Sequence, residues 1–214
     1  MTLVLYTHPM SRGRTARWMI EEIGVPYRTE ILDFGSTARA PDYLAVNPMG
    51  KVPAIRHGDT VVTETAAICA YLADAFPEAG LAPPLPDRGA YYRWLFFAAG
   101  PIEAAAANQA LGVDVPADKR GMVGYGSMEA VVAAAQSAVS ATPFIAGERF
   151  SAADVYVGAS IAWMTQFGIF PKTPAFTAYW DRIKDRPALQ RANGIDDALI
   201  AERKARADRE TKGV

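Results

Sequence analysis

The amino-acid sequence predicts an α/β domain with the element order βαβαββα, followed by an all-α helical bundle. Strand and helix patterns alternate through the first 79 residues, prolines cluster between residues 80 and 88, and the later segments have the helical period of apolar residues. We therefore expect domains at residues 1–79 and 89–214, joined by a linker at residues 80–88.

The first domain opens with a strand, a helix and a second strand. Residues 3–6 form a continuous apolar run, typical of a buried strand, and a helical pattern runs from residue 11 to about residue 23. Gly24 stands where a helix commonly ends, and residues 27–32 have the pattern of another strand. Two strands joined through a helix predict a parallel βαβ unit.

A hairpin and a third helix complete this domain. The intervening region, which contains Pro41 and Pro48, is expected to be helical in part. Residues 52–55 and 61–62 flank His57-Gly58-Asp59, a combination that predicts a hairpin turn. Ile68, Leu72 and Phe76 then share one helical face, which ends before Pro77.

The second domain is expected to contain only helices. Prolines or glycines separate five helical patterns, at residues 91–108, 119–140, 152–167, 175–184 and 188–205. Charged residues dominate positions 203–214, which we expect to fray from the last helix.

Composition and charge exclude several classes of function. The formal net charge is −1, which gives no electrostatic reason to expect nucleic acid or an anionic membrane as a partner. The N-terminal residues contain no charged leader, and no apolar run has the length of a membrane span, so a cytoplasmic location is expected. Cys69, the single cysteine, has no disulfide partner within the chain and is interpreted as a core residue; the two histidines have no metal-ligand spacing.

The first stretch whose side chains could bind a ligand or take part in catalysis is Tyr6-Thr-His-Pro-Met-Ser11-Arg-Gly-Arg14. Ser11 follows a strand and stands where a helix begins, so its hydroxyl can cap that helix and also face a bound anion. For an isolated serine in this position, capping alone is the simpler interpretation.

Two further stretches contribute polar groups. Asn47-Pro-Met-Gly-Lys-Val-Pro53 precedes a predicted strand, and Glu64-Thr65 stands where the third helix begins. An acid and a hydroxyl at a helix start are common as capping residues, so each stretch by itself is weak evidence for a ligand site.

In order and spacing, the three stretches together with the helical second half resemble the cytosolic glutathione S-transferases over nearly the whole chain. The serine in the first loop is similar to that of bacterial, theta-like members. The resemblance implies a thioredoxin-like first domain, glutathione as co-substrate, no metal and a homodimer. It implies that Ser11 hydrogen-bonds the glutathione sulfur. It also implies that the backbone of Val52, which precedes a cis Pro53, pairs with the cysteinyl part of the ligand. At the γ-glutamyl end, the resemblance implies that Glu64 binds the ammonium group and Thr65 the carboxylate. Lys51 either reaches a ligand carboxylate or stays solvated.

The implied chemistry requires a thiolate. Lowering a thiol pKa of ~8.5 by about two units takes roughly 2.7 kcal/mol. A helix dipole contributes about 0.3 to 1 kcal/mol and a hydrogen bond to a charged acceptor about 1.5 to 3 kcal/mol, so Ser11 and the helix start are sufficient together.

Tyr6 is the runner-up as activating residue. Other transferase classes use a tyrosine at the end of the first strand, but there it stands closer to the Arg-Gly-Arg triplet than Tyr6 stands to Arg12. A core or interface tyrosine is the alternative.

The resemblance also implies a hydrophobic electrophile bound beside the sulfur. Candidate pocket residues are Met10, Tyr91, Trp94 and Trp163, although aromatic residues at helical spacing are more often core. Conjugation is the expected reaction. The alternatives are a glutathione-dependent isomerase, dehalogenase or peroxidase on the same fold, or a noncatalytic glutathione-binding module.

One last motif is interpreted as structural. Phe150-Ser151-Ala-Ala-Asp154 precedes an apolar helix and resembles the folding motif of the family, in which the serine caps the helix and the aspartate bonds back to it.

Overall fold

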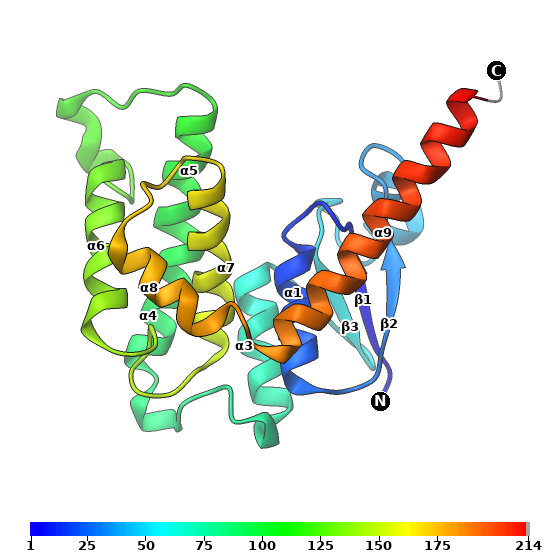
Figure 1. Ribbon diagram of the computed structural model, residues 1–214, viewed down its shortest axis with the longest axis horizontal. Helices are drawn as coiled ribbons and strands as arrows, with labels where there is room; N and C mark the ends of the chain where they lie inside the picture. The colour runs from blue at the N-terminus through cyan, green and yellow to red at the C-terminus, as the bar shows by residue number, and fades with distance from the viewer. Residues whose placement is uncertain (213–214) are drawn as a thin grey trace. The chain divides into compact units, whose positions relative to one another are not determined.

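The computed structural model describes residues 1–212, and the side chains of residues 1–209 (Figure 1). Its internal contacts divide the chain into two compact units, one made of residues 1–72 together with the chain from Asp185 onward, the other of residues 73–184. The predicted fold class is confirmed: a four-stranded sheet with helices is followed by helices alone. The expected linker at residues 80–88 stays a prediction; Leu85–Asp87 within it forms a single 3-10 turn.

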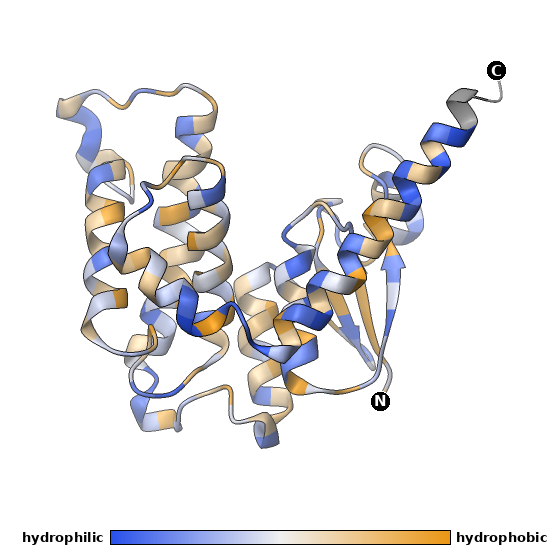
Figure 2. Cartoon of the chain, in the orientation of Figure 1, coloured by the Kyte–Doolittle hydropathy of each residue, from blue (hydrophilic) through white to orange (hydrophobic). Residues whose placement is uncertain are grey.

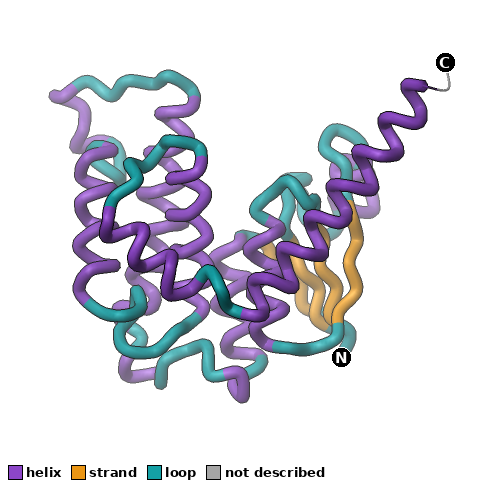
Figure 3. The backbone as a smooth tube through the Cα atoms, viewed as in Figure 1, coloured by secondary structure: helices purple, strands orange, loops and turns teal. Residues whose placement is uncertain are grey.

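The first unit is built on one mixed sheet, drawn in orange in Figure 3. The strand order is β2-β1-β3-β4, with β1 parallel to β2 and β3 antiparallel to β1 and β4. The strands are β1 Leu3–Thr7, β2 Tyr27–Ile31, β3 Ala54–His57 and β4 Thr60–Thr63. Both the parallel βαβ unit and the hairpin around Gly58, whose φ of 59° suits a glycine, are as predicted.

The two faces of β1 pack against different partners. Leu3, Leu5 and Thr7 are fully buried, whereas Tyr6 points to the other face and packs against the cluster of Ala38, Tyr43, Val46 and Ala54. The alternation follows from the period of two along a strand.

Four helices belong wholly or mainly to this unit. They are α1 Gly13–Ile23, α2 Pro41–Leu44, α3 Thr65–Ala75 and α9 Pro187–Lys212. Gly24 ends α1 in the left-handed conformation, and its N–H donates to the Ile20 carbonyl at 3.1 Å.

The second unit is helical, but two expected helices are interrupted. Pro101 lies in a π-helical turn, Ala98–Ile102, so the helix expected at residues 91–108 is divided into α4 Gly89–Phe97 and α5 Glu103–Ala110. The helix expected at residues 119–140 begins only at α6 Met128–Ala141, because Gly121, Gly124 and Gly126 interrupt the pattern and Ser127 caps the helix, accepting the Ala130 N–H at 3.2 Å. The remaining helices are α7 Ala152–Gln166 and α8 Pro174–Ile183.

The last helix differs most from expectation. The prediction that the chain frays from residue 203 is wrong for residues 203–212, which are helical up to the end of α9 at Lys212. Residues 213 and 214 lie outside the described part of the chain. Moreover, α9 lies along α1 and is therefore part of the compact unit that contains the sheet (Figure 1). Its residues are largely hydrophilic (Figure 2), and polar contacts with α1 accompany the buried apolar residues Ala188, Leu189 and Ala192.

None of the helices in residues 1–212 combines the length and apolar character that crossing a bilayer requires.

Candidate active site

The three stretches singled out in the sequence meet at one end of the sheet. Tyr6 pairs with Ala54 in the register of β1 and β3, and Ala54 pairs with Thr63 in that of β3 and β4. The loop after β1, the segment before β3 and the segment after β4 therefore leave the sheet at the same edge. Both α1 and α3 also begin there, so their N-terminal N–H groups favour bound anions at this edge.

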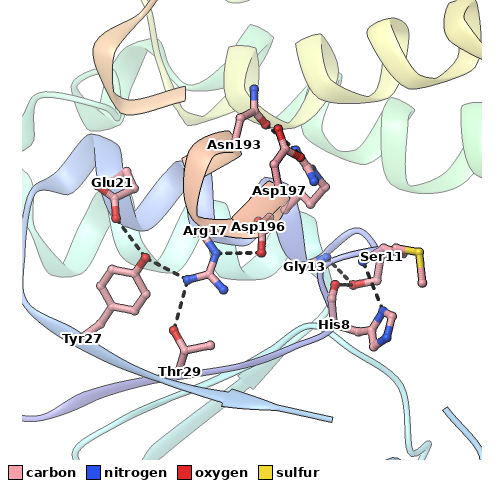
Figure 4. Close-up of polar contacts among 12 residues, drawn as sticks. His8, Ser11, Gly13, Arg17, Glu21, Tyr27, Thr29, Asn193, Asp196 and Asp197 are labelled. Atoms are coloured by element: carbon pink, nitrogen blue, oxygen red, sulfur yellow. Dashed lines mark hydrogen bonds and ion pairs between the residues drawn. The ribbon is translucent and has the colours of Figure 1, made fainter. Parts of the chain in front are cut away.

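Ser11 has two hydrogen bonds within the loop after β1 (Figure 4). Its Oγ donates to the His8 carbonyl at 2.6 Å and accepts the Gly13 N–H, the first of α1, at 2.9 Å. Arg12 is the N-cap residue of α1 and makes no side-chain capping bond, so Ser11, one position earlier, is the residue whose side chain accepts the first N–H of the helix. Because a hydroxyl has a single proton, donation to a bound sulfur requires the proton to turn away from the His8 carbonyl.

His8 is the first residue of this loop, and the sequence analysis did not name it as a site residue. Its side chain is 3% exposed, its Nδ1 accepts the Met10 N–H at 3.2 Å, and its ring packs against Phe34 with centroids 4.4 Å apart. Burial lowers the pKa of His8, Arg203 lowers it further, and Asp33 opposes them. An accepting Nδ1 is unprotonated, so the ring proton lies on Nε2.

Thr7 and Gly13 approach each other closely behind Ser11. A Cβ added to Gly13 would stand 1.8 Å from Thr7 Oγ1 and 2.9 Å from Ser11 Oγ. The Thr7 hydroxyl is fully buried and has no hydrogen-bond partner in the described part of the chain. Only glycine fits at the first position of α1.

Gly13→Ala is therefore expected to lower the free energy of unfolding by about 1 to 3 kcal/mol, the usual range for overpacking. Urea unfolding followed by circular dichroism measures the loss. Thr7→Ala removes the nearest atom and should recover part of it in the double variant. Equal losses in Gly13→Ala with and without Thr7→Ala would contradict this steric cause.

The segment before β3 holds its backbone in a defined position. The Val52–Pro53 bond is cis, as the resemblance implies. The Lys51 carbonyl accepts the Tyr43 hydroxyl at 2.5 Å and Asn47 Nδ2 at 2.8 Å. The N–H and C=O of Val52, in contrast, have no hydrogen-bond partner among residues 1–212 and can pair with an extended peptide ligand.

Glu64 has an unusual backbone conformation at the start of α3. Its φ is 65°, and it is the one non-glycine residue of the described chain with a positive φ. The Glu64 side chain is exposed, whereas Thr65 is buried. Left-handed conformations of such residues cost about 1 kcal/mol or more and concentrate at ligand sites, which makes Glu64 a candidate ligand-binding residue.

Comparisons with known proteins place the chain in a family. Residues 1–74 match the model "Glutathione S-transferase, N-terminal domain" and residues 126–187 match "Glutathione S-transferase, C-terminal domain". The glutathione S-transferase GstA of Escherichia coli O157:H7 is 30% identical over 165 residues, which cover 75% of this chain and 78% of that protein. The chain belongs to the glutathione S-transferase family. It is thus a transferase enzyme.

Solved structures of other transferases have the same fold. A glutathione S-transferase from Xylella fastidiosa superimposes with a TM-score of 0.75 at 25% identity, covering 91% of this chain and 98% of its own. A theta-class enzyme from Xanthomonas axonopodis pv. citri, with glutathione bound, gives a TM-score of 0.71 at 26% identity, covering 89% and 96%.

The side chain of Tyr6 in this transferase packs against neighbouring side chains. Its ring lies 5.5 Å from that of Tyr43 and 6.0 Å from the Arg56 guanidinium carbon, on the face of β1 opposite Thr7. These contacts agree with a core role for Tyr6, and its role as runner-up remains a prediction.

The expected electrophile-pocket residues fall in different units. Met10, in the first unit, is 65% exposed. In the helical unit Tyr91 and Trp94 are buried, and Trp163 is 43% exposed and packs 4.6 Å from Phe167. Their joint role is left as a proposal.

Cys69 lies in the core of the transferase, as predicted. It is completely buried in α3, and burial raises the pKa of its thiol, which disfavours the reactive thiolate. Within residues 1–212, no group of three or more His, Cys, Asp or Glu side chains has an arrangement that would hold a metal ion.

A row of polar contacts joins α1 to α9, and no local pattern in the sequence predicted it. Arg14 donates to Asn193 and Asp197 at 3.0 and 2.9 Å, and Arg17 donates to Asp196 at 3.0 Å (Figure 4). Further along α1, Glu21 pairs with Arg191 of α9, and Glu22 pairs with Arg186, the residue before α9. These contacts fix α1, and with it the position at which Ser11 meets the helix start.

Proposed function

We propose that this transferase conjugates the glutathione thiolate to a hydrophobic electrophile, with Ser11 as the residue that activates the sulfur. Glutathione is the co-substrate of the family and is present in the structure of the theta-class relative. The observation that carries the proposal is the position of the Ser11 hydroxyl, at the start of α1 and at the same sheet edge as the unpaired Val52 backbone and the strained Glu64.

Each part of glutathione has a complementary group at this edge. The Val52 backbone pairs with the cysteinyl residue in the manner of an added strand, next to Pro53. The Glu64 carboxylate pairs with the γ-glutamyl ammonium, and the Thr65 hydroxyl with the first N–H groups of α3 binds its carboxylate. Lys51, which is exposed, adds a charge for the remaining carboxylate of the ligand.

The reaction proceeds through the ionised sulfur. The thiol proton passes to solvent water, and the Ser11 proton turns from the His8 carbonyl to the thiolate. The sulfur then uses a lone pair to form the new carbon–sulfur bond, while the electrophile accepts the displaced electron pair on its leaving group or conjugated system. A hydrogen bond to a charged acceptor contributes about 1.5 to 3 kcal/mol and the α1 dipole about 0.3 to 1 kcal/mol, together near the roughly 2.7 kcal/mol required.

Several features follow from the family resemblance alone and are part of the proposal. They are a cytoplasmic homodimer, a role in detoxification, and contact with the electrophile by Met10, Tyr91, Trp94 and Trp163. Isomerase, dehalogenase or peroxidase activity on the same fold is the enzymatic alternative, and a glutathione-binding module without catalysis is the other.

Ser11→Ala tests the proposal. The variant should still bind glutathione, but the pKa of the bound thiol should rise by about one to two units, since a hydrogen bond of about 1.5 to 3 kcal/mol is lost. Ultraviolet absorbance of the thiolate, followed against pH, measures that pKa. Ser127→Ala, which removes a serine cap from α6 in the other unit, is the matched control and should leave the thiol pKa unchanged.

Three outcomes would contradict parts of the proposal. A thiol pKa unchanged in Ser11→Ala but raised in Tyr6→Phe would transfer activation to Tyr6. No change in either variant would assign it to backbone donors. Failure of the wild-type protein to ionise bound glutathione would leave the noncatalytic module.

A further inference from the structure

We propose that His8 is the positioning residue that aims the Ser11 hydroxyl. The inference rests on the proposed function and concerns how the loop between β1 and α1 holds its single hydroxyl in place. His8 touches the loop twice, through Nδ1, which accepts the Met10 N–H at 3.2 Å, and through its carbonyl, which accepts the Ser11 hydroxyl at 2.6 Å (Figure 4).

The ring contact closes the turn that leads to Ser11. A side-chain acceptor that binds the N–H two residues further on is a common way to fix a turn. The residue between His8 and Met10 is Pro9, whose ring fixes its φ. The ring is only 3% exposed, so water cannot readily replace it as the acceptor for the Met10 N–H. Without that acceptor, the peptide that leads into Ser11 loses its anchor.

The carbonyl contact sets the resting direction of the Ser11 proton. Ser11 Oγ is held on its other side by the Gly13 N–H at 2.9 Å, so the oxygen can stay in place while its hydrogen rotates about the Cβ–Oγ bond. A neutral carbonyl is a weaker acceptor than a thiolate, by a factor of roughly two. The hydroxyl therefore leaves the His8 carbonyl when an ionised sulfur is bound, and the helix start needs no rearrangement.

The surroundings of His8 hold the ring in this orientation. Phe34 packs against it with centroids 4.4 Å apart, and Asp33, next to Phe34, forms an ion pair with Arg203 of α9. Their charges have opposite effects on the pKa of His8: Arg203 lowers it and Asp33 raises it. A side chain at position 8 must therefore be buried and must offer an acceptor at the place of Nδ1.

Two substitutions separate the acceptor from the bulk of the ring. His8→Asn places Oδ1, which is attached to the γ carbon as Nδ1 is, in position to accept the same N–H. His8→Leu keeps a buried apolar side chain but has no acceptor. His57→Leu, which removes the other histidine and its contact with the Tyr71 hydroxyl, is the matched control.

The readout is the pKa of bound glutathione, followed by thiolate absorbance. His8→Leu should raise it by about one unit, a tenfold loss of thiolate at a pH well below the pKa, whereas His8→Asn and His57→Leu should stay near the wild-type value. Affinity for S-methylglutathione, which has no ionisable thiol, should be unchanged in all three variants because the Val52 and Glu64 contacts remain. In the Ser11→Ala background, His8→Leu should add no further increase, since it acts through Ser11.

The outcomes distinguish this inference from the proposed function. If wild type ionises glutathione and Ser11→Ala abolishes that effect, but His8→Leu does not change the thiol pKa, the positioning role is overturned and the proposed function stands. Equal increases in His8→Asn and His8→Leu, loss of S-methylglutathione binding, or an additive effect on top of Ser11→Ala would also overturn it. Absence of the thiolate in the wild type would instead overturn the proposed function.

Discussion

Asp154→Ala is expected to lower the free energy of unfolding of the transferase by about 3 to 5 kcal/mol, because it leaves several buried donors without an acceptor. Asp154 is completely buried at the third position of α7. Its Oδ2 accepts the Ser151 N–H at 2.9 Å and the Ser151 hydroxyl at 3.0 Å, and its Oδ1 accepts the Ile145 N–H at 2.7 Å and the Tyr179 hydroxyl at 2.8 Å.

The arrangement connects three parts of the helical unit through one carboxyl group. It joins the start of α7, the turn before it and α8. Burial raises the pKa of Asp154, and the hydrogen bonds from Ile145, Tyr179 and Ser151 oppose that shift. Removal of the carboxyl group leaves two N–H groups and two hydroxyls to be satisfied at once, and each unsatisfied buried group costs about 1 to 3 kcal/mol.

Urea unfolding of single-contact variants supplies the controls. Tyr179→Phe and Ser151→Ala each remove one hydroxyl and should lose about 1 to 2 kcal/mol. Asp154→Asn should fall between these and Asp154→Ala, because its amide keeps one acceptor oxygen but presents N–H to the Ser151 N–H. A loss in Asp154→Ala no larger than in Tyr179→Phe would show that the other donors find new partners.

This motif, the strands and the hairpin could be predicted because their signals are local. Ser151 and Asp154 stand three positions apart, and Gly58 marks its turn within the segment that it shapes. The start of α6 was predicted too early. The helical composition extends upstream of Met128, but the glycines before Ser127 disfavour a helix there and delay its start.

The candidate site residues were chosen from the family resemblance, and their hydrogen bonds could not be predicted from the sequence. The resemblance grouped Ser11, Val52 and Glu64, and the strand order brings the loops that carry them to one edge of the sheet. Their roles in binding glutathione stay predictions. The contact of Ser11 with the His8 carbonyl, and the burial of Thr7 against Gly13, depend on the path of the loop, which the residue types do not specify. Contacts between α1 and α9 join residues far apart in the sequence, where periodicity carries no information about partners.

The second large effect is expected at one of those contacts, the buried pair of Arg17 and Asp196, which are 1% and 0% exposed. Arg17 Nε donates to Asp196 Oδ1 at 3.0 Å, and its Nη1 donates to the Tyr27 hydroxyl and to Thr29 Oγ1 at 3.0 and 3.1 Å (Figure 4). Arg17 Nη2 and Asp196 Oδ2 have no partner among the residues that the structure describes. Asp196→Ala leaves a buried guanidinium without its counter-ion and should lower the free energy of unfolding by about 3 to 5 kcal/mol.

Replacement of both charges should be far less harmful than removal of one. Arg17→Met with Asp196→Leu replaces the pair by apolar side chains that need no solvation, and Tyr27 keeps its hydrogen bond to Glu21 at 2.9 Å. We therefore expect urea unfolding to show a double variant that recovers most of the stability lost in Asp196→Ala. Additive losses would instead mean that the charges stabilise the packing of α9 on α1. If stability recovers, the thiolate signal of bound glutathione should be measured in the double variant. An unchanged signal would mean that apolar packing of α9 is enough to hold α1, and Ser11 before it, in the orientation found with the ion pair.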